Sequence, residues 1–356
     1  MNARVTGAGH AVPAPVDQQA LWDGYFKAHY GGDGTARRVW QSSGIRTRHG
    51  VVDPTREDIS RLGTGARMRR FAEESMPLGK EAVCAALADA GLLASDVGLF
   101  AVVSCTGYAT PGLDILLARD LGMTTDVQRL SIGHMGCYAA LPGLGAVSDF
   151  VSARGRPAVL LCLELTSLHV QPPTQSARSG TPSAEDVQQM VAHALFSDAA
   201  SALVVEPNGT GLEVLDLVAR TDVSTSDHMT WDVTDLGFKM GLSPRVPDVL
   251  AEHVESVVTN LLQRNGLRLA DVAAWAVHPG GPRILDVVEL QLGLAPAVMV
   301  PSREVLRDFG NCSSATVLLV LERLMATRDL RPGDPVVAMA FGPGLTLYAA
   351  LLQVAG

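Results

Sequence analysis

The sequence lacks the features of a membrane protein, a nucleic-acid-binding protein or a secreted protein. Only 18% of its 356 residues are charged, and the net charge of −9 provides no basic field for nucleic acid or an anionic membrane. No stretch reaches eighteen uncharged apolar residues, and the amino terminus has no signal-peptide core. We therefore expect a cytoplasmic protein without membrane or nucleic-acid partners.

Cysteine is also scarce and scattered. The chain has five cysteines, and none of them forms a CxxC pair. The odd total and the wide spacing argue against a disulfide framework and against a structural zinc site. We expect reduced thiols and no bound metal, which leaves each cysteine open to another role.

An internal repeat at an offset of 175 residues divides the chain. Residues 87–107 resemble residues 262–281: each copy predicts a helix that ends at a glycine, a short turn, and an apolar strand that runs into a glycine-containing loop. At the same offset Cys137 falls on Cys312. Several matches at one offset favour a duplication, with one half over residues 1–208 and the other over 209–356.

Apolar strands alternate with helices in both halves. The expected strands are 99–105, 158–165, 201–207, 273–279 and 335–341, and the expected helices include 78–91, 247–266 and 313–328. Continuous apolar strands between helices indicate sheets that are covered on both faces. The fold class is therefore α/β.

Cys137 lies between Gly136 and an aromatic residue, where an alanine-rich apolar run begins. A cysteine on the first turn of a helix has a lowered thiol pKa, because the helix dipole favours the thiolate. Taken alone, a buried core cysteine is the more common interpretation. His134, three residues earlier, is a less suitable partner for the thiol than the histidine described next.

His278 and Asn311 are two further polar residues at the ends of predicted elements. His278 ends an apolar strand ahead of a Pro-Gly-Gly-Pro loop, and Asn311 precedes two serines. Each also has a structural interpretation, as a strand-end histidine or as a helix cap. Because the halves are duplicated, the loops of Cys137 and Asn311 are expected to meet. A thiolate, an imidazole and an amide suit acyl transfer with a stabilised enolate, and the same set could serve a cysteine hydrolase.

The motifs around these residues resemble one family. They are GCYA at Cys137, HPGG at His278, GNCSSA at Asn311, and FGPGLT at 341–346. They are similar to those of the type III polyketide synthases, the chalcone and stilbene synthase family of the thiolase-like superfamily, over about residues 5–352. The resemblance implies a thiolase-like αβαβα five-layer fold built from two duplicated halves, and a homodimer.

The resemblance also implies an activity. Cys137 would receive an acyl starter from a CoA or acyl carrier protein thioester, and His278 and Asn311 would serve decarboxylative condensation with malonyl-CoA. The product would be an alkylpyrone, a resorcinol or a related phenol. No cofactor is implied beyond the CoA thioester substrates. Met240 and the motifs ELTSLH at 164–169 and CTGYATPG at 105–112 look more like bacterial than plant members, and a lining with few aromatic residues suggests an aliphatic starter.

Further positions carry over from the family as cavity residues. Phe196 matches one gatekeeper, and Met240 stands where plant enzymes usually have a second, phenylalanine gatekeeper. Thr110 matches a residue that reaches across the dimer into the partner's cavity. The remaining cavity positions are Cys105, Thr106, Thr166, His169, Ser313, Gly342, Pro343 and Gly344.

The implied CoA contacts are fewer than the family pattern would give. Arg38 matches a basic CoA-binding position, but Ser42 stands where a lysine is usual. Arg46 or Arg48 is expected to compensate. The alternatives to a polyketide synthase are a single condensation of the ketoacyl-ACP synthase III kind, a cysteine acyltransferase or hydrolase with the same triad, and a non-catalytic acyl-thioester-binding protein.

Overall fold

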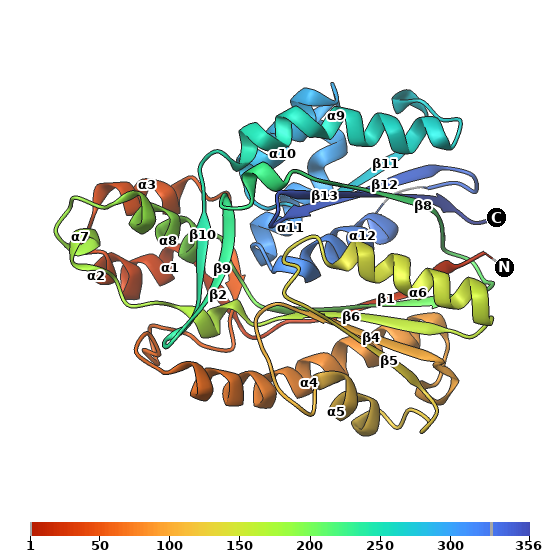
Figure 1. Ribbon diagram of the computed structural model, residues 1–356, viewed down its shortest axis with the longest axis horizontal. Coiled ribbons are helices and arrows are strands. Elements are labelled where there is room, and N and C mark those ends of the chain that lie inside the picture. Colours follow the sequence, from red (N-terminus) through yellow and green to blue (C-terminus); the bar gives the residue numbers. More distant parts are fainter. Residues whose placement is uncertain (1, 328–329) are drawn as a thin grey trace.

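The computed structural model describes residues 2–327 and 330–356, and its layers are visible in Figure 1. Two helices lie in the middle: α6 (Ala140–Arg154) and α12 (Thr316–Thr327). A layer of strands lies on each side of them. The outer faces are covered by α4 (Thr64–Ala90) and α5 (Leu113–Asp120) on one side, and by α9 (Val246–Arg264) and α10 (Pro282–Gln291) on the other. This arrangement confirms the predicted αβαβα class.

Nine strands form the sheet layers, in the spatial order β11-β12-β13-β8-β1-β7-β6-β4-β5. The first half contributes β1 (Arg4–Ala11), β4 (Leu99–Ser104), β5 (Gln128–Gly133), β6 (Ala158–Glu164) and β7 (Ala199–Glu206). The second half contributes β8 (Leu212–Thr221), β11 (Ala274–Val277), β12 (Pro335–Gly342) and β13 (Thr346–Val354). The two sets meet only where β1 pairs with β8, through Arg4–Glu213 and Val5–Leu212.

The predicted duplication is visible in the strand order. The spatial order β4-β6-β7-β1 in the first half corresponds to the spatial order β11-β12-β13-β8 in the second half. The pairs β4–β6 and β11–β12 are both parallel, and the pairs that follow are antiparallel in both halves. The exact boundary between the halves, which we placed at residue 208, stays a prediction.

The repeat at offset 175 also holds in local geometry. Gly91 caps α4, and Gly266 follows Asn265, the cap of α9. Both glycines have φ +70°, in the left-handed region that favours glycine. Asp96 and Asp271 each accept a hydrogen bond from the backbone N–H three residues earlier, at 2.9 and 2.8 Å. Equal sequence spacing therefore corresponds to equal backbone conformation.

Three hydrophobic cores hold the layers together. One surrounds α6 and α12, one lies under α4 and α5, and one lies under α9 and α10. Along β4, Ala101 and Val103 contact the central core, whereas Phe100 and Val102 contact the core under α4. Strands buried on both faces explain the continuous apolar runs in the sequence.

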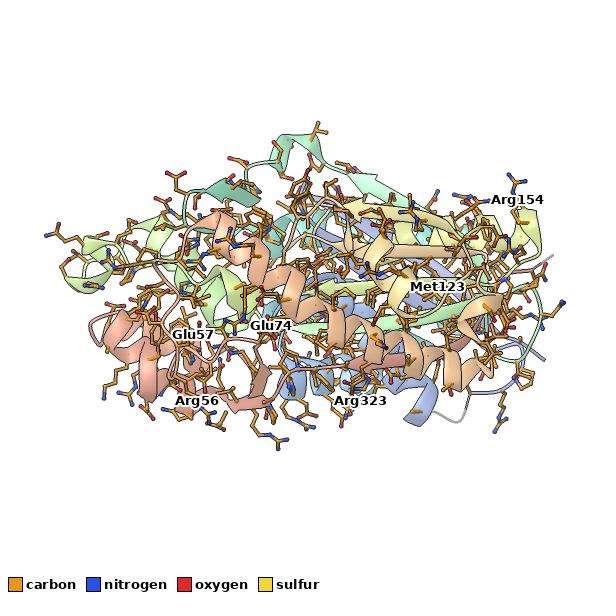
Figure 2. The ribbon with its side chains drawn as sticks, turned by 90° about the horizontal axis from the view of Figure 1, so that it is seen from below. Arg56, Glu57, Glu74, Met123, Arg154 and Arg323 are labelled. Atoms are coloured by element: carbon orange, nitrogen blue, oxygen red, sulfur yellow. The ribbon has the colours of Figure 1, made fainter. Side chains whose placement is uncertain are left out.

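The solvent side of α4 carries charged residues. Arg70 pairs with Glu57 at 3.2 Å and with Glu74 at 2.6 Å, and both glutamates lie at the lower face of the molecule (Figure 2). Exposed pairs of this kind contribute little to stability. The helix begins at Thr64, well ahead of the predicted start at residue 78.

A lobe at one end of the molecule was not predicted (Figure 1). It contains β2 (Pro15–Asp17), α1 (Gln18–Leu21), the π-helix η1 (Trp22–Phe26), α2 (Lys27–His29), α3 (Gly34–Gln41), β3 (Thr47–His49), α7 (Gln175–Arg178) and α8 (Ala184–Leu195). Its core includes Trp22, Phe26 and Trp40. The hairpin β9 (Met229–Thr234) and β10 (Gly237–Leu242) packs against α8.

The remaining elements are α11 (Val300–Phe309) and short 3-10 helices. The latter are η2 (Ala94–Asp96), η3 (Thr166–His169), η4 (Val223–Thr225), η5 (Leu269–Asp271), η6 (Pro296–Met299) and η7 (Ser313–Ala315). The predicted helix 313–328 therefore divides into η7 and α12, and its last residue lies outside the described residues. Within those residues, no helix has the length and apolarity needed to cross a membrane.

Candidate active site

One cavity of about 280 Å³ is lined by Cys137, His278 and Asn311 together. Cys137 lies in a turn between β5 and α6, and His278 directly follows β11. Asn311 follows α11 and precedes η7. The structure thus brings together three residues that lie far apart in the sequence. The loops of Cys137 and Asn311 lie at equivalent places in the two halves, and His278 lies at a strand end of the second half.

The Cys137 side chain is 4% exposed, and its Sγ lies 3.6 Å from Ser313 Oγ. Helix α6 begins at Ala140, so Cys137 lies in the turn before the helix and not on its first turn as we predicted. Burial raises the pKa of the thiol to about 12. This direction is opposite to the predicted one, because loss of hydration outweighs the dipole of a helix that begins three residues later.

The His278 side chain is 1% exposed, and neither ring nitrogen has a hydrogen-bond partner among the described residues. The ring packs edge-on against Phe341, with 5.6 Å between ring centroids. Burial lowers the pKa of His278 to about 3, so the free protein holds a neutral imidazole. Buried polar atoms in native proteins nearly always have partners. Because His278 lines the cavity, its ring nitrogens are available for hydrogen bonds to a substrate.

The Asn311 amide has a defined orientation. Its Oδ1 accepts a hydrogen bond from the Ser313 backbone N–H at 2.9 Å, and its Nδ2 donates to the Gly280 carbonyl at 3.3 Å. This network places the NH₂ group on the side of the His278 loop and leaves one N–H free of these contacts. Asn311 also forms an isolated parallel β-bridge with Phe196, so the predicted gatekeeper and the amide are joined through the backbone.

A second layer of polar groups lies behind the thiol. Cys105 Sγ is 3.4 Å from Ser313 Oγ and 3.4 Å from the Glu164 carboxylate. Glu164 is fully buried and also accepts hydrogen bonds from Thr106 Oγ1 at 2.8 Å and Ser314 Oγ at 2.5 Å. Burial raises the pKa of Glu164, and burial also raises the pKa of Cys105. We did not predict Glu164, which looked like an ordinary residue at the end of an apolar strand.

Phe196 and Met240 separate the main cavity from two smaller ones. Both residues line the main cavity, an inner pocket of about 30 Å³ next to Cys137, and a pocket of about 70 Å³ behind them. This position fits the gatekeeper role implied by the resemblance. Trp231 lines both smaller pockets and donates from Nε1 to the Cys105 carbonyl at 2.6 Å. Sequence reasoning missed it, because a tryptophan in a polar hairpin carries no motif.

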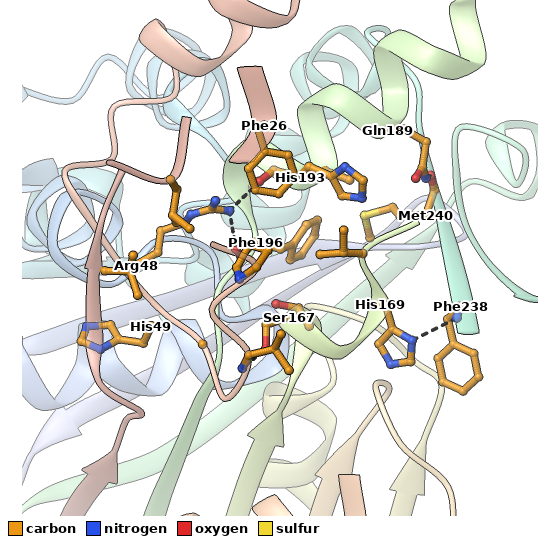
Figure 3. A pocket seen from close by; sticks show the side chains of 18 of the residues that line it. Phe26, Arg48, His49, Ser167, His169, Gln189, His193, Phe196, Phe238 and Met240 are labelled. Atoms are coloured by element: carbon orange, nitrogen blue, oxygen red, sulfur yellow. Dashed lines mark hydrogen bonds between the residues drawn. The ribbon is translucent and has the colours of Figure 1, made fainter. Parts of the chain in front are cut away.

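Figure 3 shows the pocket behind the gatekeepers. Arg48 reaches in from β3, and its guanidinium donates to the backbone carbonyls of His193 and Phe196, the latter at 2.9 Å. Burial lowers the pKa of Arg48 to about 10. The side chain therefore supports the backbone of the Phe196 segment from inside the protein.

Thr166 and His169 line the pocket of Figure 3, and both are held by the protein itself. The Thr166 hydroxyl donates to the Ser197 carbonyl at 2.9 Å. His169 Nε2 contacts the Thr106 carbonyl at 2.6 Å, and its Nδ1 accepts from the Phe238 backbone N–H at 3.0 Å. Burial lowers the pKa of His169 to about 4. With both ring nitrogens engaged, His169 shapes the wall of the pocket.

Gly342 and Pro343 of the FGPGLT motif lie against the Cys137 turn, and Gly344 lies against Thr346 and Thr221. A Cβ atom on Gly342 would be 2.9 Å from Tyr138 and 3.2 Å from the Cys137 backbone nitrogen. Pro343 lines the inner pocket beside Cys137. Gly344 has φ +133°, and a Cβ there would lie 2.5 Å from Thr346 Oγ1. Gly342 and Pro343 therefore support the cysteine turn by close packing. Two residues of the motif reach a pocket surface, Pro343 at the inner pocket and Phe341 at the main cavity.

Two predicted positions lie away from the cavity. Thr110 is exposed and lines a separate hollow beside α5 and β5. Arg38 is exposed on α3, next to the cavity residue Val39, and donates to Thr35 Oγ1 at 3.0 Å. Among the described residues, no group of three or more His, Cys, Asp and Glu side chains is arranged to hold a metal ion.

The expectation that Arg48 replaces the missing lysine is wrong, because its guanidinium is buried and donates to backbone carbonyls. The expectation for Arg46 stays a prediction. Ser42 does line the cavity, as the alignment of motifs implied. Arg46, however, pairs with Asp308 at 3.1 Å, and neither it nor Arg48 lines the cavity. Strand β3 turns alternate side chains to opposite faces, which sends Arg48 into the protein.

Comparison with known proteins identifies the family of this chain. Residues 2–209 match the N-terminal domain of chalcone and stilbene synthases, and residues 216–355 match the C-terminal domain of the same family. The chain therefore belongs to the chalcone and stilbene synthase family and is a type III polyketide synthase, a condensing acyltransferase.

Two relatives with similar sequences are synthases by name. The chain is 32% identical to the α-pyrone synthesis polyketide synthase-like Pks18 of Mycobacterium tuberculosis, with 89% of this chain and 81% of the relative covered. It is 35% identical to 1,3,6,8-tetrahydroxynaphthalene synthase of Streptomyces peucetius, with 89% and 83% covered.

Solved structures agree. The type III polyketide synthase domain of Steely1 from Dictyostelium superposes with a TM-score of 0.91 at 27% identity, with 100% of both chains covered. The tetrahydroxynaphthalene synthase of Streptomyces coelicolor also gives 0.91 at 27% identity, with 99% of both chains covered.

Proposed function

We propose that the protein loads an acyl starter onto Cys137, extends it with malonyl-CoA, and cyclises the chain to an alkylpyrone, a resorcinol or a related phenol. The observation that carries this proposal is the cavity shared by Cys137, His278 and Asn311, in which the His278 nitrogens have no partner among the described residues. Similar proteins are named for an α-pyrone, for 3,5-dihydroxyphenylacetyl-CoA and for tetrahydroxynaphthalene.

Loading begins with a proton transfer from the Cys137 thiol to His278. Burial disfavours a lone thiolate and a lone imidazolium, but transfer creates both charges in one cavity, where they stabilise each other. The thiolate attacks the starter thioester carbonyl, the carbon–sulfur bond to the carrier breaks, and the departing thiolate takes the proton from His278. The products are an acyl group on Cys137 and a free carrier thiol.

Extension uses the neutral form of His278. Its N–H and the free Asn311 N–H donate hydrogen bonds to the malonyl thioester oxygen. The bond to the carboxylate breaks, carbon dioxide leaves, and the electron pair forms an enolate at that oxygen. Because burial holds the His278 pKa at about 3, the ring is neutral, and a neutral N–H stabilises the enolate without protonating it. The enolate carbon then attacks the acyl group on Cys137 and releases the thiolate. These steps require no cofactor beyond the CoA thioesters.

The walls of the cavity suit an aliphatic chain. Its lining is mostly apolar and includes Val191, Leu195, Met229, Leu242 and Ile284. Met240 is flexible and polarisable, so it adapts to a growing chain more readily than a phenylalanine would. These features favour a fatty acyl starter.

A homodimer is also part of the proposal. Strand β5 lies at the end of the sheet, and five of its six residues are exposed, including Leu130 at 36%. Thr110 and the 65% exposed Tyr108 line the hollow beside this strand. An edge strand presents unpaired backbone N–H and C=O groups, so this edge is suited to pairing with a second copy. A cytoplasmic location stays a prediction.

A substrate panel tests the function. The protein is incubated with acyl-CoA starters of graded length and with isotopically labelled malonyl-CoA, and the products are examined by mass spectrometry. Labelled carbon dioxide with pyrones or resorcinols of two or more extensions supports the proposal. A single β-ketoacyl product would indicate the ketoacyl synthase alternative. Free acid alone would indicate a hydrolase, and no turnover would indicate a binding protein.

A further inference from the structure

We propose that His134 is the general base that closes the ring of the finished polyketide chain and releases the product from Cys137. His134 directly follows β5 and lines the inner pocket of about 30 Å³ that Cys137 also lines. The imidazole and the thiol therefore face one small space. The inference rests on the proposed function, because it concerns the last step on the same cysteine.

Few groups at the inner pocket can accept a proton. Of the residues that line it in the described part of the chain, only Cys105, His134 and Cys137 carry a titratable side chain. Burial raises the pKa of both thiols, and Cys137 holds the chain at this stage. His278 lines the main cavity but not this pocket. His134 is thus the remaining base, and histidine is the residue most often used as general acid and base.

The backbone at His134 is strained. Its φ is +57°, and Ser313, with φ +49°, is the only other non-glycine residue with a positive φ in the described part of the chain. Both residues line the inner pocket. A glycine would adopt this conformation without strain, and strain of this kind clusters at functional sites. The side chain at position 134 therefore supplies something that the backbone alone does not.

The ring of His134 is available to a substrate. Its nitrogens form no hydrogen bond or ion pair within residues 2–327 and 330–356. The ring packs edge-on against Phe238, with 6.1 Å between ring centroids, and the residue also lines the hollow beside β5. By contrast, His169 in the pocket of Figure 3 has both ring nitrogens engaged by the protein.

The proposed step balances without a further reactant. The enol hydroxyl on the fifth carbon of the chain gives its proton to the His134 imidazole, and its oxygen attacks the thioester carbonyl carbon. The bond from this carbon to Cys137 Sγ breaks, and the departing thiolate takes the proton from the imidazolium. The products are a six-membered lactone, which is an α-pyrone, and a free Cys137 thiol. Because the inner pocket is small, it suits the segment of the chain next to the sulfur, where this ring forms.

A preformed chain tests this step apart from chain extension. The protein is loaded with a 3,5-diketoacyl-CoA, the unbound ester is removed, and the decay of the adduct on the Cys137 peptide is followed by mass spectrometry. His134→Asn is expected to slow release of the pyrone at least about a hundredfold, because general base catalysis contributes about 10²–10⁴-fold. Asparagine also tolerates a left-handed φ, so this variant removes the base without added backbone strain.

His134→Gly with added imidazole is the second variant. Glycine favours the backbone conformation at this position, and the hollow beside β5 offers free imidazole a route to the vacated space. Imidazole is expected to restore part of the release rate in His134→Gly and none of it in His134→Asn, where the new side chain fills the space. His10→Asn is the matched control, because His10 lines neither the main cavity nor the inner pocket. Its release rate is expected to equal that of the wild type.

The proposal is overturned if His134→Asn releases the adduct at the wild-type rate. It is also overturned if imidazole leaves the slow release of His134→Gly unchanged, since position 134 would then act through shape alone. A wild type that releases the chain as the open diketo acid overturns it as well, because the base would then activate water.

Failure of this proposal is distinguishable from failure of the proposed function, because the experiment includes no extension by malonyl-CoA. A wild type that releases the pyrone through His134 but builds no chain from malonyl-CoA contradicts only the function. A wild type that builds polyketides while His134→Asn releases the pyrone normally contradicts only the assignment of His134.

Discussion

Gly136 and Pro343 lie so close together that a Cβ atom on the glycine would be 2.5 Å from the proline Cδ. Gly136 also has φ +83°, in the region that favours glycine. The contact joins the Cys137 turn of the first half to the C-terminal loop of the second half. The position of the thiol therefore depends on close packing between the two halves of the duplication.

We expect Gly136→Ala to damage both stability and activity. The added methyl group must move a rigid proline, which costs about 1–3 kcal/mol, and it shifts the Cys137 turn. A displacement of about 1 Å at the reacting atom lowers the rate on the order of a hundredfold. Gly122→Ala is the control, since Gly122 has φ +74° but no atom within 4 Å of the added Cβ. Equal kcat and equal thermal midpoints for the two variants would contradict the packing argument.

The partnership of Cys137 and His278 predicts a pH effect. Both groups are neutral in the free protein, and alkylation of Cys137 passes through the thiolate and imidazolium that proton transfer to His278 creates. His278→Ala removes this proton acceptor, so less thiolate forms at neutral pH. We expect iodoacetamide alkylation of the Cys137 peptide at neutral pH to slow at least about tenfold, with its pH midpoint displaced upward. Mass spectrometry of that peptide across a pH series measures both quantities.

His134→Ala is the control for this experiment. His134 lines the inner pocket beside Cys137 and lies three residues away in sequence. If His134→Ala slows the alkylation of Cys137 and His278→Ala does not, the assignment of the proton acceptor is wrong.

Trp231 is expected to limit the length of the product. It lines both the inner pocket and the pocket behind Phe196, so Trp231→Ala joins two spaces that are separate in the wild type. We expect a shift toward longer starters or additional extensions in the product spectrum. Trp231→Phe retains most of the volume but loses the hydrogen bond to Cys105. An identical product spectrum for wild type and Trp231→Ala would show that the tryptophan is no barrier.

Much of the fold was predictable because its signals are local. The repeat at offset 175 marks helix ends at Gly91 and Gly266 that share one backbone conformation. The lobe around Trp22 and Trp40 was not predicted, because its short helices are stabilised by packing with α8, which lies far away in the sequence.

The residues of the site were predictable from the sequence, but the pKa values of their side chains were less so. The duplication predicted that the loops of Cys137 and Asn311 would meet, and the HPGG motif identified His278. The shift of the Cys137 pKa was predicted in the wrong direction, because burial depends on the whole surrounding structure. The same limit explains the error over Arg48, whose side chain lines the pocket of Figure 3 and not the main cavity.

The most direct test of the account compares wild type with Cys137→Ala by intact-protein and peptide mass spectrometry after exposure to acyl-CoA and labelled malonyl-CoA. The wild type is expected to gain one acyl group on the Cys137 peptide and to form extended products. Cys137→Ala is expected to gain no acyl group and to form no extended product, while labelled carbon dioxide is still released by His278 and Asn311. Extended products from Cys137→Ala at the wild-type rate would contradict the assignment of Cys137 as the nucleophile.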